Sequence, residues 1–218
     1  MKTALFLLFI VAMPAMVYGQ ERDLGNWIIF FGDKKIKQNW NWHHEIQYRS
    51  YNAISDLEQL LLRSGIGYDL SNNNNVLFGY AYIHSQNYIS GDDNKQKTNE
   101  HRLYQQFITR QQFGRVYMQH RYRFEQRFIE TNFKLRFRYF LSINIPLNHP
   151  TMLDRTVYLS SYNEIFLNTE DTIFDRNRLY GGIGYRLNGQ MRFEAGYMNQ
   201  FLTDGGRDQI NLIAFINF

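Results

Sequence analysis

The strongest constraint on the fold is the alternation of apolar residues at the end of the chain. Counting back from the carboxyl end, every second residue is apolar: Phe218, Ile216, Ala214, Leu212 and Ile210. A period of two places these side chains on one face of an extended strand. Such a face fits either the last strand of a soluble β-sandwich or a strand that faces lipid.

A longer segment favours the lipid-facing interpretation. From Phe133 to Leu147 one face is wholly apolar, whereas the other carries Lys134, Arg136 and Arg138. A tilted strand needs only about 9–11 residues to cross the hydrocarbon layer. The mean hydropathy of −0.48 is no objection, because only every second residue of a barrel strand meets lipid. The 16 Tyr, 18 Phe and 3 Pro also suit strands and membrane-interface girdles.

The terminal strand resembles the closing strand of bacterial outer-membrane β-barrels. In those proteins the final aromatic residue and the alternating apolar positions before it are recognised by the barrel-assembly machinery. The resemblance therefore implies an assembly signal at Ile210, Leu212, Ala214, Ile216 and Phe218. It also implies two partners, the assembly machinery during insertion and the lipid of the outer membrane.

The start of the chain predicts export. Lys2 precedes an apolar run from Ala4 to Met13, and Val17-Tyr18-Gly19 has the small residues of a cleavage site. We interpret residues 1–19 as a signal peptide and residues 20–218 as one barrel domain. An uncleaved anchor is the alternative, although the apolar run is shorter than the roughly 20 residues of a membrane-spanning helix. The predicted location is the bacterial outer membrane, reached through the periplasm.

Alternating segments and turn residues predict an all-β fold, a single antiparallel transmembrane barrel of ten to twelve strands. About eleven segments can be counted, with turns at Gly32 to Lys35 and at Asn188-Gly189. Single-chain bacterial barrels have even strand numbers, so we expect ten strands from Ile36 onward or twelve in all. Leu24 to Phe31 would then lie outside the barrel or in its lumen, unless one long segment forms two strands. Short turns and longer polar loops are expected at opposite ends.

Several short motifs resemble the domain of unknown function 2490 family. They are an N-terminal Gly-Asn-Trp strand followed by Trp40-Asn41-Trp42, the run Glu100 to Tyr104, and the run Arg121 to Glu125. The similarity extends over the whole mature chain. It implies a predicted outer-membrane barrel with no established activity, and it brings no catalytic residue to this sequence.

The inward face of such a barrel would be rich in arginine and tyrosine. The candidate charge network, which could also form an anion path, comprises Glu45, Arg102, Arg121, Arg123, Glu125, Arg136, Arg138, Glu164 and Arg178. One hypothesis is a lumen filled by Arg–Glu–Tyr hydrogen bonds in a structural role. The other is a narrow channel whose surplus cations attract a small anionic solute.

Other functions have weaker signals. His84-Ser85 is the one adjacent His–Ser pair, but neighbours along a strand point to opposite faces, which opposes a lipid-hydrolase dyad. His44, His101 and His120 could still meet a distant serine. We expect no enzyme, no cofactor and no metal, since there is no cysteine and the histidines lack ligand spacing. The net charge of +4 is spread, not clustered, so nucleic-acid binding is not expected. Adhesion through the loops Ile89 to Asn99 and Thr169 to Asn177 is a further alternative.

Overall fold

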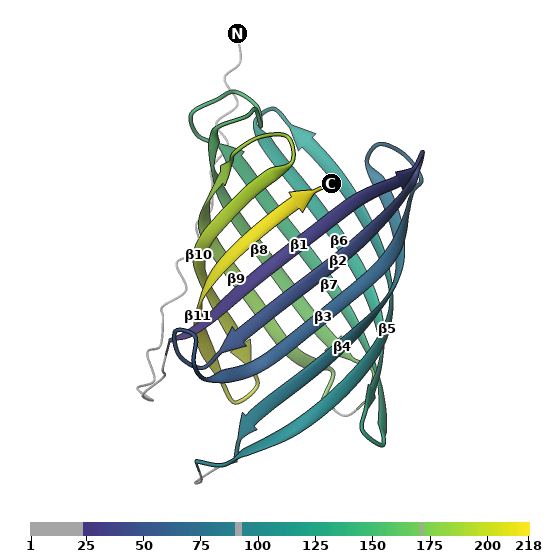
Figure 1. The fold of residues 1–218 in the computed structure, drawn as a ribbon, viewed down its shortest axis with the longest axis vertical. Coiled ribbons are helices and arrows are strands. Elements are labelled where there is room, and N and C mark those ends of the chain that lie inside the picture. Colours follow the sequence, from purple (N-terminus) through teal and green to yellow (C-terminus); the bar gives the residue numbers. More distant parts are fainter. Residues whose placement is uncertain (1–23, 90–92, 171) are drawn as a thin grey trace, which may run out of the picture.

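The computed structural model describes residues 24–89, 93–170 and 172–218, which form eleven β-strands. The strands are β1 (Gly25–Lys37), β2 (Trp40–Ser50), β3 (Leu57–Asp69), β4 (Asn74–Tyr88), β5 (Lys95–Phe113), β6 (Val116–Ile129), β7 (Asn132–Pro146), β8 (Thr156–Asn168), β9 (Phe174–Arg186), β10 (Met191–Leu202) and β11 (Gly205–Asn217). They close into one barrel (Figure 1). The predicted all-β barrel of ten to twelve strands is confirmed. Residues 1–19, the predicted signal peptide, lie outside the described residues.

Within the described ranges, no helix has the length and apolar character needed to cross a membrane.

The barrel closes through a parallel pair of strands. β1 and β11 run side by side in the same direction (Figure 1), with Gly25 opposite Gln209 and Asp33 opposite Asn217. The expectations of an even strand number and a wholly antiparallel sheet are therefore wrong at this pair. Residues 25–31 lie in the barrel wall, neither outside it nor in the lumen. Strands joined by hairpins alternate in direction, so an odd number can close only through a parallel pair.

The first hairpin turns later than the sequence predicts. Gly32 to Lys35 do not form a turn; they continue β1 to Lys37, and Gln38 takes a positive φ of 35° at the actual turn. Pairing with β2 explains the difference. Asp33 is in register with His43, and its carboxylate bonds the His43 ring at 2.8 Å. The polar residue Asp33 therefore has its partner within the strand pair.

The end of the barrel where β11 finishes is the C-terminal end, and the end where β1 starts is the N-terminal end. At the C-terminal end lie the connections 38–39, 70–73, 114–115, 147–155 and 187–190. The predicted separation of short turns from long loops is wrong in one respect, because the longest connection, 147–155, lies at the C-terminal end. Arg115 and Arg186 hold it by donating hydrogen bonds to the backbone oxygens of His149 (3.1 Å) and Met152 (2.7 Å).

The outer face of the wall is largely apolar, and several of its polar side chains bond one another. Exposed apolar residues are found on all strands, for example Ile28, Trp42, Ile66, Phe78, Tyr122, Phe137, Leu159, Leu179, Phe193 and Leu212. The Trp42 indole donates to Ser64 Oγ at 2.8 Å, and His120 bonds the Tyr139 hydroxyl at 2.8 Å. Reciprocal amide pairs join Gln105 to Gln126 (3.0 and 3.3 Å) and Asn163 to Asn177 (2.7 and 3.3 Å).

The lumen is polar on one side and apolar at the parallel seam. Trp27 and Ile29 of β1 pack with Tyr180, Met198 and Ile213 in a buried cluster. The seam thus adds an apolar patch to the polar, arginine- and tyrosine-rich lumen that the sequence predicts. β1 carries apolar residues on both faces, which explains why its sequence reads as a continuous aromatic-rich run instead of an alternating one.

Candidate functional site

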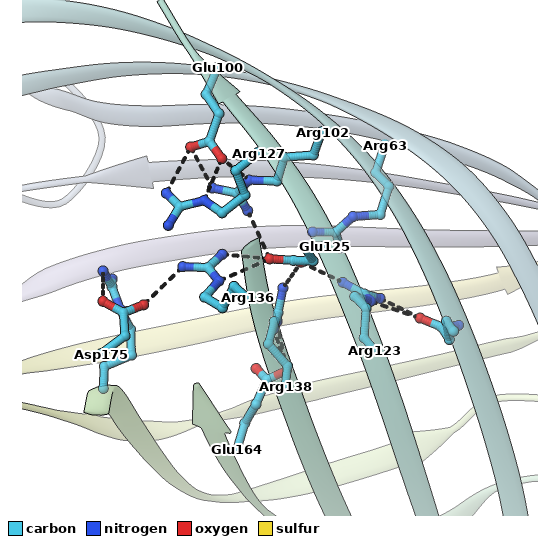
Figure 2. Close-up of polar contacts among 12 residues, drawn as sticks. Arg63, Glu100, Arg102, Arg123, Glu125, Arg127, Arg136, Arg138, Glu164 and Asp175 are labelled. Atoms are coloured by element: carbon cyan, nitrogen blue, oxygen red, sulfur yellow. Dashed lines mark hydrogen bonds and ion pairs between the residues drawn. The ribbon is translucent and has the colours of Figure 1, made fainter. Parts of the chain in front are cut away.

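Eight of the nine predicted lumen residues form one layer across the lumen, which we call the septum. Its members come from β5 to β9: Arg102, Arg121, Arg123, Glu125, Arg136, Arg138, Glu164 and Arg178. Figure 2 shows most of them converging on Glu125 from neighbouring strands. The ninth residue, Glu45 of β2, lies beside this layer and forms an ion pair with Arg63.

Glu125 is the centre of the septum, with four guanidinium groups around one carboxylate. Arg136 donates from Nε (3.0 Å) and Nη2 (2.6 Å) to Oε2, and Arg138 donates from Nη1 to Oε1 at 2.6 Å. Arg102 and Arg123 lie farther away, at 3.9 and 3.8 Å. The Glu125 side chain is 1% exposed, so its charge is balanced by these arginines and not by water.

A second carboxylate, Glu164, joins the other half of the layer. Its Oε1 accepts hydrogen bonds from Arg138 Nε (3.1 Å) and Nη2 (2.6 Å) and from Arg121 Nη2 (2.7 Å). Arg178 Nη1 lies 3.7 Å from Oε2. Arg138 therefore bridges both carboxylates, and its planar guanidinium suits this role because it donates from several edges at once.

Trp27 extends the septum to the seam, although it was not among the lumen residues predicted from the sequence. The Arg178 guanidinium lies 4.8 Å from the centroid of the Trp27 ring, and the Arg49 guanidinium lies 3.8 Å from it. Arg49 comes from β2 and Arg178 from β9, so one indole connects two distant parts of the wall by cation–π contacts. The sequence offered no signal for this position, because β1 is apolar on both faces and its alternation does not say which face points inward.

Further ion pairs flank the septum towards the N-terminal end. Glu100 accepts from Arg127 Nε at 2.6 Å and also pairs with Arg102. Asp175 accepts from Arg136 Nη1 at 2.9 Å (Figure 2). Sequence reasoning missed Asp175 because it assigned this residue to a polar loop, whereas it belongs to β9.

Burial of the inward side chains on β6 and β7 is greatest at the septum. On β6, Arg123 (3% exposed) and Glu125 (1%) lie between the half-buried Arg121 and Arg127. β7 repeats the profile, with Arg136 and Arg138 buried between half-buried inward neighbours on either side. Water therefore reaches the inner wall from both ends, but the septum itself presents almost no surface to it.

Arginine outnumbers carboxylate in this buried layer. The septum as defined contains six arginines and two glutamates. Removing charges from water is costly unless partners compensate for the lost hydration. Neutral side chains also accept hydrogen bonds from the septum arginines. Gln106 Oε1 accepts from Arg123 Nε at 3.0 Å, and Gln200 Oε1 accepts from Arg178 Nε at 2.8 Å. The layer therefore carries a net positive charge.

Glycines in the wall leave room for tyrosine rings that lie over them on the inner face. A side chain at Gly184 would meet the Tyr158 ring, since a Cβ there would lie 2.1 Å from its Cζ. Tyr158 of β8 thereby reaches over β9 and donates to Glu194 Oε1 at 2.9 Å, while Ser160 donates to Oε2 at 2.9 Å. Glu194, a buried carboxylate of β10, is thus capped by hydroxyl groups.

His84 and Ser85 point to opposite faces of β4, as the sequence predicts, and so do not form a dyad with each other. Ser85 Oγ accepts from Gln59 on the inner face, whereas His84 bonds Asn99 on the outer face. His101 bonds Tyr80 at 2.6 Å, and His120 bonds Tyr139. In the described part of the chain, no three His, Asp or Glu side chains are grouped as a metal site.

Comparison with known proteins identifies the family. The profile described as "Protein of unknown function (DUF2490)" matches residues 24–211, which is nearly the whole barrel. The chain belongs to the DUF2490 family. This confirms the family resemblance found in the sequence, and the motifs that carried it, on β1, β2, β5 and β6, lie within the matched range.

One relative of this DUF2490 chain is an uncharacterised protein of Methylorubrum extorquens. It is 30% identical over 167 residues, which cover 72% of this chain and 69% of the relative. No solved structure matches the chain.

Proposed function

We propose that the protein is an outer-membrane β-barrel whose lumen is closed by the septum, so that it does not conduct ions in this conformation. The observation that carries the proposal is the buried layer around Glu125 and Glu164, in which Arg138 bonds both carboxylates. The same layer joins the five consecutive strands β5 to β9 through their inward side chains. This role corresponds to the filled-lumen hypothesis drawn from the sequence.

The outer face supports placement in a membrane. Its exposed residues are largely apolar, and several of the polar side chains on it have partners within the wall, as in the Gln105–Gln126 pair. Unpaired polar atoms are costly in hydrocarbon, where water cannot bond them. A soluble barrel would have no need to pair them. The terminal strand, with Leu212 exposed on the outer face, is suited to the same environment and to recognition during assembly.

Conduction of anions is the second candidate function. It is favoured by the surplus of arginine in the septum, because a ring of positive charge attracts anions. It would require the septum to open. The hydrolase alternative has no comparable geometric support, since His84 and Ser85 lie on opposite faces of β4. No observation of the described loop residues favours the adhesion alternative.

Planar-bilayer recording of the refolded protein tests both functions. We expect the parent barrel to be silent and Arg138→Ala to conduct with a preference for anions, because the truncation removes the bridge between the two carboxylates while five septum arginines remain. The matched control is Arg207→Ala, which removes an arginine that pairs with Glu58 at the N-terminal end. The control should stay silent. Steady conductance of the parent, or silence of Arg138→Ala, would show that the septum is not the barrier.

A further inference from the structure

The C-terminal mouth of the lumen differs from the N-terminal mouth in how its arginines are partnered. At the N-terminal mouth, Arg207 pairs with Glu58 at 2.6 Å and Arg127 with Glu100 at 2.6 Å. At the C-terminal mouth, the inward arginines include Arg110 near the end of β5, Arg192 near the start of β10, and Arg186 of β9, which is in register with Arg192 and lies 3.9 Å from Asp154. Within the described residues, Arg110 and Arg192 form no ion pair.

Arg110 and Arg192 face each other across the lumen. In the strand order, β5 and β10 are separated by β6 to β9 on one side and by β11 and β1 to β4 on the other, which places them on opposite walls. Two like charges held in this way favour a ligand of opposite charge between them.

The neighbours of these arginines leave N–H groups free for a ligand. Arg110 Nε donates to the Gln119 amide oxygen at 3.2 Å, a neutral partner. The Arg192 guanidinium stacks on the Phe215 ring at 3.9 Å, which occupies its face and leaves its edges available. Guanidinium edges match the paired oxygens of carboxylate and phosphate groups.

The carboxylates near this mouth are engaged elsewhere. They include Asp33 near the end of β1 and Asp69 at the end of β3. Asp33 bonds the His43 ring at 2.8 Å, and Asp69 accepts from the Asn75 amide at 2.8 Å.

The floor and walls of this space supply further donors and positive charge. Arg121 forms the surface of the septum that faces the C-terminal mouth, and its buried Nε has no hydrogen-bond partner. Ser142 and Asn144 of β7 are half-buried and inward, in register with Gln119 and Tyr117. An anion here would meet arginine on two walls, neutral polar groups on a third, and the net positive septum beneath.

We infer that the lumen above the septum, between Arg110 and Arg192, binds a small oxyanion bearing a phosphate or carboxylate group. The inference goes beyond the closed-barrel role, and it is independent of it, because binding at the mouth requires neither an open septum nor a membrane.

Calorimetric titration of the detergent-refolded full chain with inorganic phosphate, at constant ionic strength, tests the site. The parent should bind phosphate saturably, and Arg110→Gln and Arg192→Gln should each weaken binding at least tenfold through loss of a charge-assisted donor. Acetate in a second titration distinguishes a carboxylate preference from a phosphate preference. Both substitutions are at the mouth, and the mobility shift between heated and unheated samples verifies that the variants have folded.

Arg207→Gln is the matched control, since it removes the same charge at the opposite mouth, where the arginine already has a carboxylate partner. It should bind phosphate as the parent does. The inference is overturned if the parent binds phosphate no better than an equal ionic strength of chloride. It is also overturned if Arg110→Gln and Arg192→Gln retain parental affinity, or if Arg207→Gln loses as much as they do.

Discussion

Glu125→Gln is expected to destabilise the barrel by about 3–5 kcal/mol, the range for removing one partner of a buried ion pair. The amide keeps the size of the side chain but removes the charge on which Arg136 and Arg138 converge. Arg102 and Arg123 lose the same counter-charge at longer range. Denaturant unfolding of the refolded protein in detergent, followed by tryptophan fluorescence, measures the loss.

Glu58→Gln is the appropriate comparison for Glu125→Gln. Glu58 also pairs with one arginine, Arg207 at 2.6 Å, but both side chains are partly exposed, at 16% and 18%. Water compensates for much of the lost interaction there, and we expect a cost of no more than about 1 kcal/mol. Equal costs at the two positions would mean that Glu125 does not balance the buried arginines.

Cysteines placed at the parallel seam are expected to cross-link almost completely. The chain has no cysteine of its own, so engineered pairs report without background. Phe30 is in register with Ala214 on β11, and on its other side with Ile46 on β2. Phe30→Cys with Ala214→Cys should form a disulfide on mild oxidation, because adjacent strands are about 5 Å apart. Electrophoretic mobility without reductant measures the yield.

The same oxidation of Ile46→Cys with Ala214→Cys provides the decisive contrast. β1 separates these positions by two strand spacings, roughly 10 Å, which is too far for a disulfide. β2 and β11 run antiparallel to each other, however, and could pair directly in an ordinary ten-strand barrel. Efficient cross-linking of Ile46→Cys with Ala214→Cys would therefore show that β1 is not part of the wall.

Much of this wall could be predicted because alternation is a local signal. The faces of β6 and β7 follow directly from every second residue, and so do the inward positions of Glu125, Arg136 and Arg138. The place of β1 could not be predicted in the same way. Its two apolar faces carry no alternation, and a parallel partner at the far end of the chain leaves no hairpin signal.

The composition of the septum could also be predicted, but its connectivity could not. Arginines at alternate positions of neighbouring strands point to the same face as Glu125 and Glu164, so their meeting in the lumen could be predicted. Which guanidinium bonds which carboxylate depends on strand register and on the length of each side chain, and local sequence specifies neither. The Arg49–Trp27–Arg178 stack joins the first hairpin to β9, which is distant in sequence, so it became visible only in the closed barrel.

Tryptophan quenching by brominated lipid tests most directly whether the outer wall faces lipid and the septum side faces the lumen. Of the 3 tryptophans, Trp40 and Trp42 are 48% and 41% exposed on the outer face, and Trp27 is 2% exposed inside. After reconstitution into vesicles, Trp27→Phe should be strongly quenched, whereas the double variant Trp40→Phe, Trp42→Phe should keep the fluorescence of Trp27. Equal quenching of the two variants, or a protein that stays in solution and escapes quenching altogether, would contradict a lipid-facing barrel with a closed interior.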